Sequence, residues 1–242
     1  MANVLGEMNA AATLQSPCDD CDIRDLAICG ALRTNEVQRL NRIMTTMDLA
    51  AGDPIVDEGE PSDFVYTLTT GAVRLYKLLA DGRRSVTGFL FPADFLGVSM
   101  QHTYSTSAEA ITPVTLCRFQ RTELGRLMEE IPTLERRLFA RATEELSLMQ
   151  EQIVLLGRKS AAERVASFLR GLSERQVKRH LPANPVSVPM TRTDIADYLG
   201  LTTETVSRTI TQFKSKDLIS VENASRIRIV DRDQLDDLAE AN

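Results

Sequence analysis

The sequence has no long apolar run and few cysteines. No run approaches the roughly 18 apolar residues that a membrane span needs. The first residues, "MANVLGEMNAAATLQ", carry neither the basic segment nor the continuous apolar segment of a signal peptide. Four cysteines in 242 residues are too few for a disulfide scaffold. We therefore expect a cytoplasmic protein that has no membrane partner and keeps its cysteines as thiols.

Histidine is also scarce, and His102 and His180 are the two in the chain. The sequence contains no Cys-x-x-Cys-His motif for haem attachment. It also contains no recognisable Ser-His-Asp or Cys-His set for nucleophilic catalysis. Haem therefore has no support, and we expect a protein that is not an enzyme.

The net charge of −6 conceals a basic region. Residues 159–230 hold 12 Lys and Arg against 7 Asp and Glu, and the rest of the chain holds 16 against 27, so the two parts carry +5 and −11. A basic region within an acidic protein favours a local surface for a polyanion. From charge alone, an ordinary solvated face explains it equally well.

The apolar pattern changes along the chain. Residues 31–48 have the spacing of a short amphipathic helix, and residues 49–120 alternate with period two. The Asp81-Gly82 pair and other turn residues separate β-branched and aromatic runs, which predicts several short strands in a barrel or sandwich. From residue 122 to residue 156 the period is helical.

This helical region has apolar residues at spacings of 4, 3, 4, 4, 4, 3, 4 and 3, close to the heptad rhythm of a coiled coil. Pro132 is expected in the first turn of the long helix, where its missing N–H costs least. A helix of some 25 residues is about 37 Å long, so a homodimer seam explains it better than packing on the chain's own β domain. The apolar residues are Leu127, Ile131, Leu134, Leu138, Ala142, Leu146, Met149, Ile153 and Leu156. The expected dimer contacts are Ile131, Leu138, Leu146, Met149, Glu151 and Ile153.

Residues 192–213, "RTDIADYLGLTTETVSRTITQF", have the spacing of a helix-turn-helix. Ala196 is small where two helices would cross, and Gly200 allows the first helix to stop and turn. Val206 would then anchor the second helix in the core, and Thr202 or Thr203 would cap it.

The second helix carries Glu204, Ser207 and Arg208 on one face near its N-terminus. An arginine can bind guanine O6 and N7 through two hydrogen bonds, and a glutamate can accept from cytosine N4. The three residues therefore predict sequence-specific binding of double-stranded DNA. The alternative is that Glu204 and Arg208 only form a surface ion pair.

The order of a β-rich region, a long helix and a winged helix-turn-helix resembles the CRP/FNR superfamily of bacterial transcription regulators over nearly the whole chain. The E-x-x-S-R run from Glu204 to Arg208 is similar to the recognition motif of the FNR (fumarate and nitrate reduction regulator) subgroup. The resemblance implies an α+β fold with an N-terminal cyclic-nucleotide-binding-like β-roll, a dimerisation helix and a C-terminal winged helix-turn-helix domain. It also implies a homodimer that binds an inverted repeat of TTGAT-type half-sites. The expected boundaries are 1–30 for a cysteine-bearing arm, 31–121 for the β-roll, 122–157 for the helix and 158–242 for the DNA-binding domain.

Three of the four cysteines lie in a polar stretch, "SPCDDCDIRDLAICG", with the spacing C-x2-C-x7-C, and the fourth is Cys117. Four thiolates are the usual ligands of a [4Fe–4S] cluster and also of a structural zinc ion. This layout resembles that of the FNR subgroup. In that subgroup, three cysteines in the arm and one late in the β-roll hold an oxygen-labile [4Fe–4S] cluster. The resemblance therefore implies such a cluster on Cys18, Cys21, Cys29 and Cys117. The seven residues between the second and third cysteines indicate a variant, because the best-known pattern is shorter there.

Cyclic-nucleotide binding is not expected. The superfamily often uses a Gly-Glu pair for the ribose and an Arg-Ser pair for the phosphate, and this chain has Val98 and Thr106 where the Glu and Arg would stand. A valine cannot accept from ribose hydroxyls, and a threonine does not supply the positive charge that phosphate recognition uses.

Acidic residues also lie along the expected seam, at Glu144, Glu145 and Glu151. Like charges that meet across a two-fold axis would keep the dimer marginal. By resemblance to the FNR subgroup, Glu151 is the position nearest to the acidic residue that tunes the dimer.

The sequence thus predicts an oxygen-responsive, DNA-binding transcription regulator that acts as a homodimer, with RNA polymerase as an expected partner. One alternative is a CRP-like regulator with a structural zinc ion or another effector. A second is an iron–sulfur electron carrier, which would have no use for a helix-turn-helix.

Overall fold

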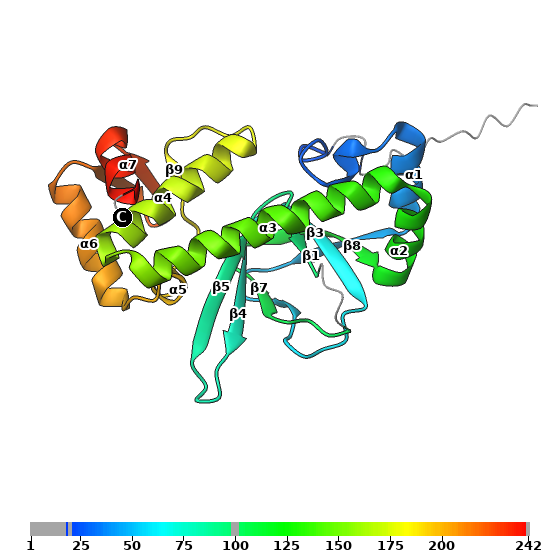
Figure 1. The fold of residues 1–242 in the computed structure, drawn as a ribbon, viewed down its shortest axis with the longest axis horizontal. Helices are drawn as coiled ribbons and strands as arrows, with labels where there is room; N and C mark the ends of the chain where they lie inside the picture. The colour runs from blue at the N-terminus through cyan, green and yellow to red at the C-terminus, as the bar shows by residue number, and fades with distance from the viewer. Residues whose placement is uncertain (1–17, 19–20, 98–101, 241–242) are drawn as a thin grey trace, which may run out of the picture.

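The computed structural model describes residues 18, 21–97 and 102–240, and Figure 1 shows their arrangement. A β domain lies along the middle of the long helix α3, and a C-terminal domain lies at one end of α3 (Figure 1). In chain order the elements are η1 (Ile28–Ala31), α1 (Thr34–Arg42), β1 (Met44–Leu49), β2 (Pro54–Val56), β3 (Phe64–Thr70), β4 (Val73–Leu78), β5 (Arg84–Leu90), β6 (Phe95–Leu96), β7 (Ser107–Ala110), β8 (Val114–Gln120), α2 (Arg121–Glu130), α3 (Pro132–Arg158), α4 (Ala161–Lys178), β9 (Val186–Ser187), α5 (Arg192–Leu199), α6 (Thr203–Ser215), β10 (Ile219–Asn223), β11 (Arg226–Ile229) and α7 (Arg232–Glu240). None of the helices in the described residues combines the length and the apolar character that a membrane crossing requires.

The β domain consists of two antiparallel four-stranded sheets. Their strand orders are β1-β8-β3-β6 and β2-β7-β4-β5. The hairpin between β4 and β5 turns at Asp81-Gly82, where Gly82 has a φ of 81°, as the sequence predicts. Leu68 of β3, Val73 of β4 and Leu116 of β8 are among the residues that fill the space between the sheets. This packing defines the β-roll.

Helices cover the other face of the β1-β8-β3-β6 sheet. Val65 of β3 and Phe119 of β8 form one side of this second core, and α1, α2, η1 and the first part of α3 form the other. Cys117 packs against the same core, because it lies two residues before Phe119 on β8 and therefore on the same face. The sheet thus places β8, the last strand of the β domain, next to the arm that precedes this domain in the chain.

The region expected to be one helix over residues 122–157 is two helices. α2 ends at Glu130 and α3 begins at Pro132, with Ile131 between them at φ −124° and ψ 85°. Pro132 occupies the first turn of α3, as predicted. The break redirects the chain from the β domain into the long helix.

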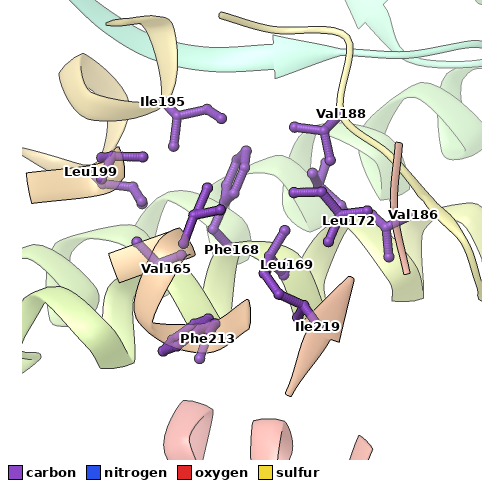
Figure 2. Close-up of a cluster of buried hydrophobic side chains, with 14 of the residues drawn as sticks. Val165, Phe168, Leu169, Leu172, Val186, Val188, Ile195, Leu199, Phe213 and Ile219 are labelled. Atoms are coloured by element: carbon purple, nitrogen blue, oxygen red, sulfur yellow. The ribbon is translucent and has the colours of Figure 1, made fainter. Parts of the chain in front are cut away.

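The C-terminal domain is a winged helix-turn-helix whose core also includes Val86 and Phe89 of β5. Val165 and Leu169 of α4, Phe213 of α6 and Ile219 of β10 converge in it (Figure 2). The sheet β10-β11-β9 supplies the wing, in which β10 and β11 form an antiparallel hairpin. The sequence analysis did not predict α7, which packs against α4 and fully buries Leu235.

An ionic contact joins the C-terminal domain to the β domain at Asp94. Its carboxylate accepts hydrogen bonds from Arg175 of α4 at 2.6 Å and from Arg179, the C-cap of that helix, at 2.7 Å. The two guanidinium groups also lie over the ring of Phe91.

A second ionic contact is centred on Asp194 of α5, whose side chain is fully buried. The carboxylate accepts from Arg74 of β4 at 3.1 Å and from Arg84 of β5 at 2.9 Å. The same residue donates its N–H to Thr191, the N-cap of α5, at 3.1 Å. The helix-turn-helix is therefore anchored to the β domain at its first turn.

One predicted element is shorter than expected. Helix α1 ends at Arg42, and the residues from Met44 onward form β1 instead of extending the helix to residue 48. β1 pairs with β8 along its whole length. A strand so paired is stabilised by distant residues, which local periodicity does not register.

Candidate functional site

The helix-turn-helix is formed by α5 and α6. Ala196 and Val206 are buried where the two helices cross. Gly200 ends α5 in the left-handed conformation with a φ of 61°, which favours glycine. Thr202 caps α6 by accepting from the Thr205 N–H at 3.1 Å. The local geometry thus follows the sequence pattern closely.

The predicted DNA-reading residues are exposed on α6, at the outer edge of the molecule (Figure 1). The guanidinium of Arg208 donates to the carboxylate of Glu204 at 2.7 Å, and the two side chains are 78% and 71% exposed. The Ser207 hydroxyl donates to the Thr203 carbonyl at 2.8 Å. The ion pair proposed as the alternative is present, and it leaves both side chains accessible to a groove of DNA.

Sequence reasoning missed part of this surface. Thr211, Gln212 and Ser215 line a shallow hollow together with the three predicted residues. Thr211 and Ser215 lie four and eight residues after Ser207, so the helical period would have found them.

The four predicted cysteine ligands come together from two distant parts of the chain. Cys18 and Cys21 lie in the arm, Cys29 lies in η1 and Cys117 lies on β8, and all four are half-buried. The Cys18 thiol donates to Asn41 of α1 at 3.6 Å. The arm is therefore packed against the domain that carries Cys117.

Cys18, Cys29 and Cys117 pack against the same core, and their burial and mutual charges shift the pKa values of two of the thiols. Burial, followed by the charges of Cys18 and Cys21, raises the pKa of the Cys29 thiol to about 11. Burial, followed by the charges of the three arm cysteines, raises the pKa of the Cys117 thiol to about 12. A cationic centre bound to the sulfurs would lower the pKa of both thiols, because a coordinating thiol is deprotonated.

The thiols are close but do not converge on one point. Among the described residues, no three His, Cys, Asp or Glu side chains are close enough to hold a single metal ion. A tetrahedral zinc site with Zn–S distances of about 2.3 Å brings its sulfurs to within roughly 4 Å of one another. A [4Fe–4S] cluster attaches each thiolate to a different iron, so it accepts a wider set of donors. Four cysteine donors are the set that either a [4Fe–4S] cluster or a structural zinc ion requires, so the donor chemistry fits both groups.

From Phe139 onward, α3 carries a largely exposed apolar stripe. Its residues, here called the α3 stripe, are Phe139, Ala142, Leu146, Met149, Ile153 and Leu156. They recur at spacings of 3, 4, 3, 4 and 3, which is the a/d pattern of a coiled coil. Phe139 is 75% exposed and Ile153 is 70% exposed. Sequence reasoning missed Phe139, which begins the stripe.

Two of the expected dimer contacts lie elsewhere. Ile131 and Leu138 are only 2% and 6% exposed, and they pack in the chain's own core beneath α3. Their assignment to a dimer face is corrected by this burial. Leu146, Met149 and Ile153 are exposed on the α3 stripe.

Glu144 and Glu151 do not lie on the α3 stripe, whereas Glu145 lies beside it, three residues after Ala142 and four before Met149. Glu144 pairs with Arg141 and with Lys178 of α4. Glu151 is two residues from both Met149 and Ile153, which turns it about 200° away from the stripe at about 100° per residue. Its carboxylate is close enough to raise the pKa of Tyr198, which burial already raises. This placement removes the basis for Glu151 as a dimer contact.

The residues weighed for a cyclic nucleotide are only partly visible. Val98 lies outside the described residues. Thr106 is half-buried, and the hydroxyl of the adjacent Ser107 accepts from the Glu58 N–H at 2.9 Å. The expectation that no cyclic nucleotide binds stays a prediction.

Comparisons with known proteins agree with this architecture. Residues 163–238 match the Crp-like helix-turn-helix domain, and residues 46–131 match the cyclic nucleotide-binding domain. The chain is 41% identical over 224 residues to the nitrogen fixation regulation protein FixK of Bradyrhizobium diazoefficiens, covering 93% of this chain and 94% of the relative. It is 43% identical over 221 residues to the transcriptional activatory protein AadR of Rhodopseudomonas palustris, covering 91% and 92%. The solved structure of FixK2 from Bradyrhizobium japonicum superimposes with a TM-score of 0.77 at 36% identity, covering 83% of this chain and 99% of that one.

The chain belongs to the Crp/FNR family of DNA-binding transcription regulators. The predicted family and fold class are confirmed, with the β-roll, the long helix and the C-terminal helix-turn-helix in the predicted order.

Proposed function

We propose that this chain is an oxygen-responsive regulator of transcription whose Cys18, Cys21, Cys29 and Cys117 hold a [4Fe–4S] cluster. The observation that carries the proposal is that Cys18 and Cys29 pack against the same core as Cys117, which lies about 90 residues later in the chain. When bound, the cluster supplies the chemistry that reacts with oxygen. The chain's own part is to offer four thiolates in a half-buried site between the arm and β8.

The same proposal assigns DNA recognition to α6. Arg208 would donate two hydrogen bonds to a guanine, and Glu204 would accept from a cytosine. Their ion pair at 2.7 Å holds the two side chains parallel on one face of the helix. By resemblance to the FNR subgroup, the target is an inverted repeat of TTGAT-type half-sites.

A homodimer would form through the α3 stripe. Two recognition helices must reach half-sites about 34–36 Å apart, one turn of DNA. A coiled-coil pairing of the stripe would bury six side chains from each copy and set the two reading helices in a symmetric pair.

The expected partner beyond DNA is RNA polymerase, and we propose activation because the name of the relative AadR describes a transcriptional activatory protein. Binding chromosomal DNA also agrees with the cytoplasmic location expected from the sequence. Cyclic AMP is expected to leave operator affinity unchanged.

The cluster assignment is tested on the full chain purified without air. We expect iron and inorganic sulfide with a brown colour, and the loss of both when any one of the four cysteines is replaced by serine. His102→Ala is the control, because this exposed residue is not a proposed ligand. Stoichiometric zinc without sulfide would establish the alternative of a structural zinc ion.

The recognition assignment is tested by the affinity for operators that differ at single base pairs. Arg208→Ala should cost about 1–3 kcal/mol at one base pair of each half-site and relax the preference there. Replacing Glu204 should change which base is preferred. Lys214→Ala is the control, an exposed lysine at the far end of α6, and it should weaken all sequences alike if it contacts phosphate. Uniform weakening by Arg208→Ala would show that Arg208 reads no base.

A further inference from the structure

The cysteine loop, residues 22–28 between the second and third cysteines, folds back on itself. The Ala27 N–H donates to the Ile23 carbonyl at 2.9 Å. Gly30 lies against the same turn, and a Cβ there would meet the Asp25 carbonyl oxygen at 2.4 Å. No side chain fits at that distance, so Gly30 is required for the loop to close over η1. The loop is therefore a compact turn packed against η1.

Two arginines of α3 hold this loop by its backbone. Arg137 donates through Nη2 to the carbonyls of Asp25 at 3.0 Å and Leu26 at 3.2 Å. Arg141 donates through Nη2 to the same Leu26 carbonyl. The two arginines are four residues apart and therefore lie on one face of the helix. Both guanidinium groups converge on a single point of the loop.

This contact has a cost. Like charges one helical turn apart repel each other. Within the described residues, the Nε atoms of Arg137 and Arg141 are buried without a hydrogen-bond partner. A buried donor without a partner is unfavourable, so these side chains give up hydration for the contact with the loop. An ordinary solvated helix face does not do this.

The loop also reaches the C-terminal domain. The carboxylate of Asp25 lies 3.0 Å from Nε2 of His180, just beyond α4. Arg141 binds Glu144 at 3.0 Å, and Lys178 of α4 approaches Glu144 at 3.4 Å. The arm and the C-terminal end of α4 accordingly lie on the same side of α3 and face each other (Figure 1).

We propose that Arg137 and Arg141 are positioning residues that couple the cysteine loop to α3 and, through Asp25 and Glu144, to the DNA-binding domain. Phe139 lies between the two arginines and about 200° around the helix from each. The loop therefore grips α3 on one face at the level where the α3 stripe begins on the opposite face. A change in the loop moves the start of the stripe and the end of α4 together. The coupling to oxygen rests on the proposed function, whereas the hydrogen bonds between α3 and the cysteine loop do not depend on it.

The grip is tested by hydrogen–deuterium exchange of the full chain, with its metal content measured in parallel. In the variant Arg137→Gln/Arg141→Gln, the amides of residues 22–31 should exchange at least about tenfold faster, because the charge-assisted hydrogen bonds that hold the loop are lost. Arg136→Gln is the matched control. Arg136 is exposed and bonds to Pro132 of its own helix at 3.4 Å, so the loop should exchange as in the wild type. Unchanged exchange in the double variant would overturn the proposal.

The coupling is tested by the ratio of operator affinities in anaerobic and air-exposed protein. The double variant should retain iron and sulfide and the anaerobic operator affinity, while the ratio falls at least about fivefold toward one, within the range of measured coupling energies. Gly30→Ala, which displaces the Asp25 carbonyl, should lower the ratio in the same direction and provides a second route to the result. Replacing Arg137 by lysine instead of glutamine in the double variant keeps a positive donor and should restore part of the ratio.

The possible outcomes distinguish the proposed coupling from the proposed function. Faster loop exchange with an unchanged ratio would reduce the arginines to a structural role and overturn the coupling. A wild-type ratio of one would overturn both the coupling to oxygen and the proposed function, and the exchange experiment would still decide whether the arginines hold the loop.

Discussion

The two halves of α3 carry similar apolar residues but bury them differently. In the first half, Leu134 and Leu138 are buried against the chain's own β domain. In the second half, Leu146 and Ile153 are among the most exposed large apolar side chains in the described residues. Apolar periodicity in a sequence therefore identifies a face of a helix, and it does not identify what covers that face.

The spacing itself contains the point where the partner changes. Steps of three and four residues alternate along a straight seam, whereas the three steps from Leu134 to Leu146 are all of four. Each step of four advances about 40° beyond a full turn, so three of them rotate the apolar line by about 120°. Phe139 starts a new line that alternates correctly to Leu156. The run of fours marks the transition from the core to the α3 stripe.

The largest expected effect is on the core half of α3. Leu134→Ala should lower the free energy of unfolding by about 2–5 kcal/mol, because it removes a fully buried side chain and leaves a cavity. The measurement is urea denaturation at several protein concentrations. Leu146→Ala is the control. Its effect on the free energy of unfolding should depend on protein concentration, since the proposed partner of Leu146 is a second chain. Equal, concentration-independent losses would show that the two halves do not differ.

A smaller effect is expected on the stripe half. Ile153→Ala should weaken dimerisation by about 1.5–3 kcal/mol for each side chain that the interface buries, and leave monomer stability unchanged. Analytical ultracentrifugation gives the dimer constant. Val154→Ala is the matched control, since this neighbouring side chain is also exposed but lies off the stripe. If Val154→Ala weakened the dimer as much as Ile153→Ala, the stripe would not be the interface.

The predictability of the two sites follows from how they are assembled. The DNA-reading face arises from Glu204, Ser207 and Arg208 on one helix, so local spacing was sufficient to place it. The cysteine site needs β8 to bring Cys117 to the arm, and the pairing of β8 with β1 and β3 that does this is not visible in any local pattern. Its four members were grouped by resemblance to the FNR subgroup.

The positioning of the cysteine loop was beyond the sequence altogether. Arg137 and Arg141 contact carbonyl oxygens of Asp25 and Leu26, and a backbone acceptor has no side-chain signature. Helix α7 was missed for a related reason. Only Leu235 and Ala239 of this short helix are buried, which is too few apolar positions for a period to be recognised.

The smallest expected effect concerns the acidic residues of α3. The sequence suggested that Glu151 repels its two-fold mate and keeps the dimer marginal, but Glu151 lies on the opposite side of α3 from the stripe and near Tyr198. Glu151→Ala should therefore change the dimer constant by no more than about 0.5 kcal/mol, with and without air. Met149→Ala, the same kind of truncation on the stripe, should weaken the dimer measurably. Analytical ultracentrifugation of both variants decides the matter. A dimer in air that is much tighter for Glu151→Ala than for the wild type would restore repulsion at the seam as the switch. The expected result would remove Glu151 as the residue that opposes pairing and would favour the proposed coupling of the cysteine loop to α3.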